Sequence, residues 1–174
     1  MKSRFTVFLG LGLLTLSLTG CPPKAQVKKE EPPKPEETQK AEAVQEPSLR
    51  GKDYKEVPEL AAIYFDLDQS SLRNDAREAL QKNYQALKEH GDWEVLVEGH
   101  CDERGTTEYN LGLGQRRAAA VRAYYMTLGI QGTRIATISY GKEKPVCEEH
   151  NEDCWSKNRR AATKARINPE KAEK

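Results

Sequence analysis

Hydrophobic residues from residue 61 onward follow two kinds of spacing, one typical of strands and one typical of helices. Short runs rich in β-branched and aromatic residues predict strands. In residues 93–99 the hydrophobic residues alternate with Glu94 and Glu98, which places the two glutamates on the opposite face of that strand. The expected strands cover residues 61–68, 93–99, 134–140 and 160–167.

Two longer segments carry hydrophobic residues at helical spacing. The first, with Asn74 as its N-cap and Gly91 at its end, has a hydrophobic stripe at Ala76, Leu80, Tyr84 and Leu87. The second runs from about Thr107 to Leu128 and ends at Gly129, with the inward positions Ala118, Val121, Tyr125 and Leu128. The order of elements is therefore β-α-β-α-β-β.

This order predicts an α/β fold, an α+β sandwich in which one sheet is packed with helices. A right-handed crossover makes the first two strands parallel, so both end at the same edge of the sheet, where α/β folds usually bind ligands. Asp66 and Asp68 lie at the exit of the first strand, and Asp102 lies at the exit of the second. On the second helix, one face carries Asn110, Leu113 and Arg117.

The N-terminal segment has the features of an export signal. Two basic residues precede a short apolar run, and "LTGC" follows at residues 18–21. The run is shorter than the roughly 20 residues that a membrane-spanning helix needs. "LTGC" resembles the lipobox of bacterial lipoproteins, which implies cleavage after residue 20 and acylation of Cys21. By the same resemblance, Pro22 favours the outer membrane. The alternative is an ordinary signal peptide, residues 1–20, followed by a cysteine by chance.

Residues 21–60 differ in composition from the rest of the chain. They hold six of the nine prolines before residue 48, and most of the other residues are Lys, Glu, Gln and Ala. Such a segment buries too little apolar surface to offset its ordering entropy, so we expect a disordered tether. The alternative is a disordered tail with no role. Residues 61–168 are then one folded domain, and residues 169–174 a short flexible tail.

Charge and residue chemistry argue against several classes of function. The net charge of +1 gives no reason to expect nucleic acid as a partner. His100, Cys101 and Asp102 are consecutive, and neighbouring side chains in an extended segment point to opposite faces. A nucleophile and its base must be in hydrogen-bond contact, so we do not expect an enzyme or a cofactor.

The cysteines favour a disulfide over a metal site. Cys147 and Cys154 are separated by six residues, with His150 between them, which is not a standard zinc spacing. An exported chain folds in an oxidising compartment, so a Cys147–Cys154 disulfide is the simpler prediction. Cys101 is then left as a small buried residue rather than a reactive thiol.

Asp102 and Arg117 suggest a third kind of chemistry, the binding of a ligand that carries both charges. A carboxylate suits an ammonium group, and a guanidinium suits a carboxylate. A plain salt bridge between a loop and a helix explains the same pair equally well. Gly112 and Gly114, which weaken the second helix, also leave two explanations open: close approach of a ligand, or tight packing of the helix on the sheet.

Four segments carry a resemblance to a known family: "IYFDLD", "VEGHCDERGTTEYNLGLGQRRAAAV", "ISYGKEKP" and "SKNRRA". Over residues 61–167 the chain closely resembles the peptidoglycan-associated lipoproteins, which share the C-terminal domain of outer-membrane protein A. The resemblance implies non-covalent binding of the peptidoglycan stem peptide through the zwitterionic side chain of meso-diaminopimelate. It assigns this contact to Asp102 and Arg117, with further contacts at Asp68, Asn110 and Leu113. The closing residues Asn158, Arg159 and Arg160 have an expected structural role.

The resemblance also implies a cellular role and partners. Such lipoproteins link the outer membrane to the wall and bind TolB, a periplasmic protein of the Tol-Pal system that serves envelope integrity and cell division. The chain departs from the pattern at Cys101, often a small residue such as Ala, and in the Cys147–Cys154 loop. Two alternatives remain: a module that chiefly docks Tol partners, with wall binding secondary, and an exported thiol enzyme that uses Cys101.

Overall fold

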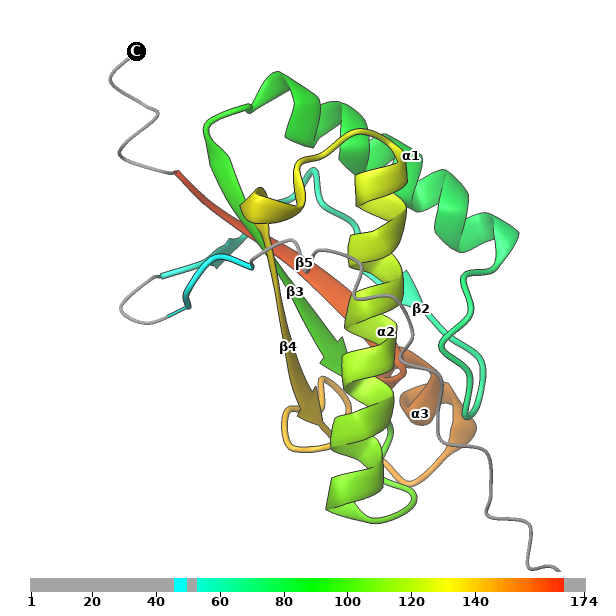
Figure 1. Cartoon of the computed structure of the whole chain (residues 1–174). Helices are drawn as coiled ribbons and strands as arrows, with labels where there is room; N and C mark the ends of the chain where they lie inside the picture. Colours follow the sequence, from blue (N-terminus) through cyan, green and yellow to red (C-terminus); the bar gives the residue numbers. More distant parts are fainter. Residues whose placement is uncertain (1–45, 50–52, 168–174) are drawn as a thin grey trace, which may run out of the picture. The chain divides into compact units, whose positions relative to one another are not determined.

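One mixed sheet, with helices packed on it, organises the part of the chain that can be described. A computed structural model describes residues 46–49 and 53–167 of the 174 residues (Figure 1). The elements in chain order are β1 (Lys55–Glu56), β2 (Ile63–Tyr64), α1 (Asn74–Glu89), β3 (Trp93–His100), α2 (Thr107–Thr127), the 3-10 helix η1 (Gly132–Arg134), β4 (Ile135–Gly141), α3 (Glu152–Asn158) and β5 (Arg160–Ile167). The expected signal segment, Cys21 and the tail 169–174 lie outside the described residues.

The sheet has the strand order β1-β5-β3-β4, with β2 also paired to β5. β3 runs parallel to β4 and antiparallel to β5. Since β2 is also antiparallel to β5, β2 and β3 point in the same direction, with β5 between them. The predicted α/β fold and the common direction of the first two expected strands are therefore confirmed.

The core lies between the sheet and helices α1 and α2, which Figure 1 shows on one side of the strands. The helices contribute Leu80, Leu87, Val121 and Tyr125 to it, and the central strands contribute Val95, Val97, Ala161 and Ala165. The predicted inward residues Ala76 and Ala118 are also buried, whereas Tyr84 and Leu128 are only partly buried. No helix of the described part is long and apolar enough to cross a membrane.

Helix α1 begins at the position expected for its cap, one residue earlier than predicted. Arg73 is the N-cap and Asn74 is already helical, and no side chain caps the first turn. The Arg73 guanidinium instead binds Asp66 at 2.7 Å and Asp75 at 2.6 Å. The helix ends at Glu89, two residues before Gly91, because the His90 amide closes the last turn on Ala86 O.

Helix α2 packs on β3 at a point where two glycines meet. A Cβ on Gly99 would lie 1.9 Å from the carbonyl oxygen of Gly114. A Cβ on Gly114 would lie 2.3 Å from the hydroxyl of Ser139 and 3.0 Å from Gly99 O. Tight packing of the helix on the sheet therefore explains Gly114. At Gly112 the nearest such contact is 3.5 Å, from the end of Arg116, so no close approach restricts that position.

Three short elements, β1, η1 and α3, were not predicted from the sequence. Strand β1 pairs with β5 through Lys55↔Ala165 and Glu56↔Lys164, and Leu60 joins the core at 7% exposure. The C-terminal end of the segment expected to be a tether thus lies against the sheet. Two strand residues among prolines and charges carry no periodicity that a sequence pattern can reveal. Helix α3 is seven residues long and mostly polar.

The first expected strand is shorter than its sequence pattern indicates. Only Ile63 and Tyr64 pair with β5, and the Phe65 amide still bonds to Arg159 O at 2.9 Å. The chain then turns, with the amide of Gln69 donating to Asp66 O at 3.2 Å and Asp68 in the left-handed region at φ 58°. The strand therefore ends before the aspartates, which lie in a turn.

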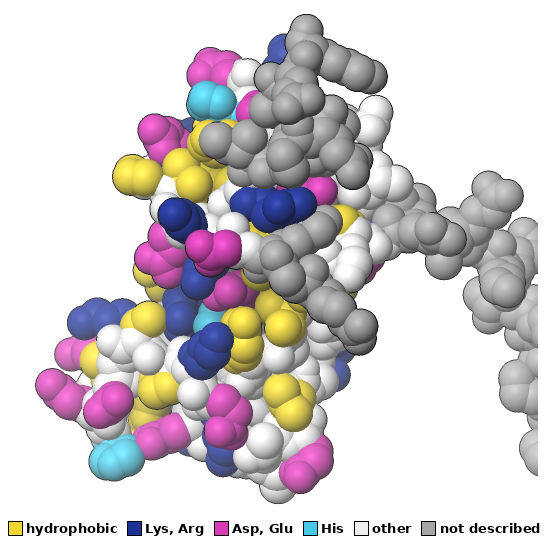
Figure 2. Space-filling model, turned by 90° about the vertical axis from the view of Figure 1, so that its left-hand side faces the viewer, with side chains coloured by type: hydrophobic (Ala, Val, Ile, Leu, Met, Phe, Trp, Pro, Cys, Tyr) yellow, Lys and Arg dark blue, Asp and Glu magenta, His cyan; other side chains and the backbone are white. Residues whose placement is uncertain are grey.

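The sheet face opposite the two long helices carries paired charges. The alternation of Glu94 and Glu98 with hydrophobic residues is typical of side chains that face solvent. In the structure, however, these two glutamates are only 8% and 6% exposed. Arg166 lies 3.0 Å from Glu94, and Lys164 lies 3.1 Å from Glu98. On the face of the molecule in Figure 2, acidic and basic side chains are likewise interspersed rather than separated into regions of one sign.

Candidate ligand-binding site

A pocket of about 210 Å³ lies at the edge of the sheet where β2 and β3 end. All five residues that the sequence singled out for ligand binding line it: Asp68, Asp102, Asn110, Leu113 and Arg117. Its other side chains include Leu67, Arg104, Tyr109 and Arg159. The topology that predicted a shared edge for these residues has therefore brought them together.

Asp68 reaches the pocket from the turn after β2. Its φ of 58° is a conformation that aspartate tolerates better than most residues. Its carboxylate accepts a hydrogen bond from the hydroxyl of Tyr109 in the first turn of α2. Leu67 and Tyr109 are 54% and 48% exposed, so hydrophobic surface borders the polar interior of the pocket.

Asp102 follows β3 and is 4% exposed, between two guanidinium groups. Arg104 donates to both carboxylate oxygens, at 2.6 and 3.2 Å, and its backbone amide adds a bond of 3.1 Å. Arg159 donates to the same carboxylate at 3.3 Å. Burial disfavours the charged form, but these hydrogen bonds outweigh it and hold the pKa of Asp102 below its ordinary value. The carboxylate is therefore ionised at neutral pH.

Arg117 is fully buried, and its guanidinium binds the backbone of two other segments. It donates to Gln69 O and His100 O at 2.8 Å each and to Asp66 O at 3.1 Å. Burial lowers the pKa of Arg117, but an arginine side chain stays charged in proteins. The residue therefore joins the turn after β2 to the end of β3 and brings one positive charge beneath the pocket.

A salt bridge between Asp102 and Arg117 was one of the two explanations for this pair, and it is not among the ion pairs of the described residues. Asp102 pairs with Arg104 and Arg159, and Arg117 binds carbonyl oxygens. The fork of Arg117, expected to face a ligand, is thus directed largely at the protein's own backbone. Among the pocket's guanidinium groups, that of Arg104 is accessible, with its side chain 35% exposed.

Asn110 and Leu113 have different surroundings on the inner face of α2. The Asn110 amide donates to Arg104 O at 2.8 Å and Thr106 O at 3.0 Å, so it fixes the loop that carries Asp102. Leu113 is 4% exposed and forms an apolar wall. The predicted common face of Asn110, Leu113 and Arg117 is confirmed, since all three are buried.

Four side chains of the pocket were assigned no ligand role from the sequence: Leu67, Arg104, Tyr109 and Arg159. Arg104 and Tyr109 lie inside a quoted motif but next to residues with a clearer signal. Arg159 is 57 positions from Asp102 in the chain, so only the pairing of β5 with β2 and β3 brings the two together. Local sequence patterns carry no information about such a contact.

His100 and Cys101 point to different sides of β3, as expected for consecutive residues. The His100 ring lies 3.6 Å from Glu98 and stacks on Tyr140. The Cys101 thiol donates to Asn110 O at 3.3 Å, on the α2 side. Burial raises the pKa of the Cys101 thiol, which disfavours the reactive thiolate. This geometry does not support a thiol–imidazole catalytic pair.

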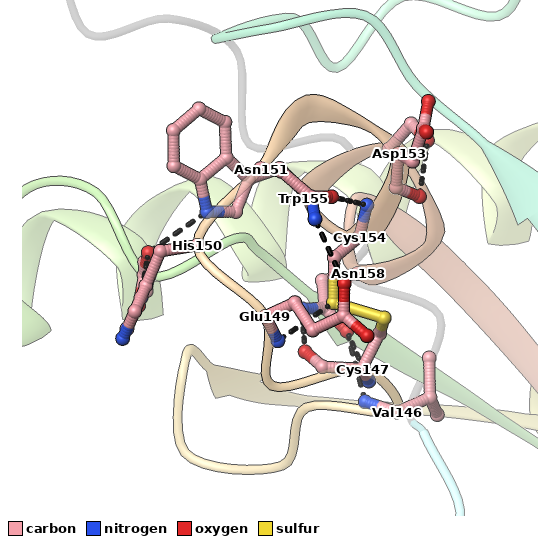
Figure 3. The surroundings of a disulfide bond; sticks show 11 residues. Val146, Cys147, Glu149, His150, Asn151, Asp153, Cys154, Trp155 and Asn158 are labelled. Atoms are coloured by element: carbon pink, nitrogen blue, oxygen red, sulfur yellow. Dashed lines mark hydrogen bonds and ion pairs between the residues drawn. A yellow bond between two sulfur atoms is a disulfide. The ribbon is translucent and has the colours of Figure 1, made fainter.

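The structure contains the predicted disulfide between Cys147 and Cys154, with the Cα atoms 5.2 Å apart. Figure 3 shows Asn158 beside it: the Asn158 side chain accepts from the amide of Val146 at 2.8 Å and donates to Cys147 O at 2.6 Å. The disulfide and Asn158 together close the segment between β4 and β5. That segment borders the pocket through Arg159.

Comparison with known proteins accounts for this arrangement. The sequence model of the OmpA family matches residues 64–159, which include the pocket residues from Leu67 to Arg159. The chain belongs to the OmpA family. This membership agrees with the fold, because an OmpA-like domain has a mixed sheet with helices packed against it.

Relatives within the OmpA family are named peptidoglycan-associated lipoproteins. One from Rhizobium meliloti is 52% identical over 101 residues, 58% of this chain and 57% of the relative. One from Pseudomonas aeruginosa is 44% identical over 105 residues, 60% of this chain and 62% of the relative. The chain thus matches somewhat under two thirds of the length of these curated relatives.

A solved structure supports the same assignment. The crystal structure of the peptidoglycan-associated lipoprotein from Burkholderia pseudomallei superposes with a TM-score of 0.58 at 44% identity. It covers 60% of this chain and 89% of that chain. The similarity is therefore to nearly the whole of that structure and to the folded domain of this protein.

Proposed function

We propose that this protein binds peptidoglycan non-covalently, with the diaminopimelate of the stem peptide in the pocket between β2, β3 and α2. The observation that carries the proposal is an ionised, buried carboxylate, Asp102, in the same pocket as the charge of Arg117. The side chain of meso-diaminopimelate ends in an ammonium and a carboxylate on one carbon. A pocket with both signs of charge suits such a zwitterion.

Each pocket residue has a distinct role in this proposal. Asp102 and Asp68 accept hydrogen bonds from the ligand ammonium. Arg104, the accessible guanidinium, turns from Asp102 toward the ligand carboxylate, while Arg117 contributes its charge from below and holds the two segments that form the pocket. Leu67 and Tyr109 pack against apolar parts of the stem peptide. No covalent bond forms or breaks, so the protein acts as a binder and not as an enzyme.

Sedimentation with isolated peptidoglycan tests the proposal. A soluble chain beginning after Cys21 is expected to pellet with wall that contains diaminopimelate. Asp102→Asn should remain in the supernatant, because it removes the negative charge without changing the side chain's size. Glu108→Gln is a matched control, since Glu108 is exposed in the first turn of α2 and does not line the pocket. If the unmodified chain stays in solution while folded by circular dichroism, wall binding is not its function.

The proposal extends to the membrane. Acylation of Cys21 anchors the protein in the outer membrane, and the segment after it, as far as the strand β1, spans the distance to the wall. Metabolic labelling with palmitate should mark the chain and should be lost in Cys21→Ala. Recovery of unmodified protein in the soluble periplasmic fraction would exclude the anchor.

The proposed partner besides peptidoglycan is a TolB-like periplasmic protein, in a Tol-Pal role in envelope integrity and cell division. This part rests on the likeness to peptidoglycan-associated lipoproteins. The Asp102→Asn variant separates the two partners, because it removes charge from the pocket and leaves the remaining surface unchanged. Loss of wall binding with retained binding to a TolB-like protein would show that the two contacts are distinct.

A further inference from the structure

The segment closed by the Cys147–Cys154 disulfide contacts both arginines that surround Asp102. Glu152, the first residue of α3, lies 2.5 Å from the Nη2 atom of Arg159. Its second oxygen lies 3.8 Å from the Nη2 atom of Arg104. A residue of the disulfide-closed segment therefore completes the charge network of the pocket.

Trp155 adds a second connection to the loop that carries Asp102. The Arg104 guanidinium lies over the Trp155 ring, 4.3 Å from its centre. The Trp155 indole N–H donates to Glu103 at 2.8 Å. The two contacts hold the loop after β3 against the first turns of α3, so the position of α3 determines where Arg104 can reach.

The position of Glu152 depends on how its segment is closed. Cys154 lies two residues further along α3 and is bonded to Cys147, and the Asn151 side chain accepts the hydrogen bond of the Cys154 amide at 2.9 Å. Figure 3 shows these groups together around the disulfide. Glu152 itself is 61% exposed, so burial does not hold it in place. The ion pair with Arg159 and the covalent closure of the segment restrict it instead.

The charges in the pocket show what Glu152 contributes. Among the described residues, two carboxylates form ion pairs with both Arg104 and Arg159: those of Asp102 and Glu152. If Glu152 were absent, two positive charges would act on a single buried carboxylate. That carboxylate would then attract a ligand ammonium less strongly. Glu152 offsets part of this charge from the outer side.

We propose that Glu152, fixed by the Cys147–Cys154 disulfide, is a positioning residue that holds the Nη2 group of Arg159 away from Asp102 and offsets part of the charge of Arg104, so that Asp102 can bind an ammonium group. The proposal rests on the proposed function, because it concerns the ammonium of diaminopimelate. It also links the disulfide to ligand binding: reduction frees the segment that carries Glu152, and affinity for the wall falls.

Calorimetric titration of the oxidised chain with two soluble stem peptides tests this role. One peptide has the free ammonium of diaminopimelate, and the other has that amine acetylated. Glu152→Gln should weaken binding of the free peptide about fivefold, the upper range for a largely exposed ion pair. It should change binding of the acetylated peptide less, so the ratio of the two affinities falls. Asp153→Asn removes the same charge one residue away, at an exposed side chain, and should leave the ratio unchanged.

The disulfide is tested by a second pair of variants. Cys147→Ala with Cys154→Ala should lower the same affinity ratio, and adding Glu152→Gln to it should have little further effect. If the losses of affinity from the cysteine substitutions and from Glu152→Gln simply add in the combined variant, the link to the disulfide is overturned. An equal loss for both peptides in Glu152→Gln would indicate a merely structural effect and would overturn the positioning role.

The outcome also separates the two proposals. Failure of the unmodified chain to bind the free peptide would contradict the proposed function itself. If the unmodified chain and Glu152→Gln bind the free peptide equally well, the proposed function is retained and the role of Glu152 is rejected.

Discussion

The carboxylate of Asp102 and the guanidinium of Arg117 line the same pocket, yet each is held by partners other than its neighbour. Asp102 binds Arg104 and Arg159, whereas Arg117 binds the carbonyl oxygens of Asp66, Gln69 and His100. A ligand therefore does not have to break a salt bridge between them. It competes for Asp102 with arginines that have other acceptors available.

The buried position of Arg117 predicts a large stability effect at this residue. Arg117→Ala leaves several carbonyl groups without their buried donor, so the free energy of unfolding should fall by about 3 kcal/mol or more. Arg116→Ala is the matched control and should change it by less than about 0.5 kcal/mol, because Arg116 is exposed. Urea denaturation measures both, and equal losses would contradict the placement of Arg117 on the inner face.

Two glycines of helix α2 should respond in opposite directions to replacement by alanine. Gly112→Ala should raise the free energy of unfolding by up to about 1 kcal/mol, because alanine favours helix and the site has room. Gly114→Ala should lower it by about 1–3 kcal/mol, because the new methyl meets Ser139 and Gly99. Thermal denaturation of the two variants tests this, and a stable Gly114→Ala protein would contradict the close packing of α2 on β3.

The burial of His100 predicts that the stability of the protein depends on pH. Burial lowers the pKa of His100, although Glu98 beside it partly opposes this effect. In the unfolded chain the imidazole takes up a proton as the pH falls through about 6.5, whereas the folded protein takes it up at lower pH. The unfolded state therefore binds more protons in this range, and stability should decrease as the pH falls below about 6.5.

Urea denaturation between pH 5 and pH 8 measures this effect. His100→Gln removes the titrating group and should flatten the profile in that range. His150→Gln, at an exposed histidine, serves as the control, and the decrease of stability toward low pH should persist in it. A slope that persists in His100→Gln would assign it to another group.

The disulfide should stabilise the domain as well as the pocket. It closes a short segment, with a sequence separation of 7, so its loss should lower the free energy of unfolding by about 2–3 kcal/mol. Denaturation with and without a thiol reductant measures this. A Cys101→Ala background excludes a contribution of Cys101, the buried free cysteine of the described residues. A reductant that leaves the denaturation midpoint unchanged would contradict a stabilising disulfide.

The long elements could be predicted from the sequence because their signals are local. Helix α2 and strand β5 have nearly the expected bounds, since hydrophobic spacing and flanking residues lie within each element. Strand β1 could not be predicted, because a strand of two residues is too short to show an alternation of hydrophobic and polar residues. The burial of Glu94 depends on Arg166, 72 positions away, so its partner is visible only after β3 and β5 pair.

The candidate site could be predicted in position but not in its internal contacts. Strand direction was enough to bring Asp68 and Asp102 to one edge, and helical spacing was enough to align Arg117 with them. The choice of partners depends on side-chain reach across a folded surface. The sequence therefore could not show that Arg104 and Arg159, rather than Arg117, bind Asp102.

The attachment of β1 has a mechanical consequence. On the N-terminal side, Glu46 accepts hydrogen bonds from Thr137 of β4, and Lys55 and Glu56 pair with β5. Further along, Leu60 is in the core, and the backbone N–H and C=O of Ala61 are both hydrogen-bonded to the Asn83 side chain. Tension on the N-terminal side would peel β1 from β5 before it reaches these anchors. About five residues would then be free to extend to a span of at most roughly 15–20 Å, part of which they already cover in the fold. A pull on the N-terminal side would thus extend the chain before it disturbed the pocket.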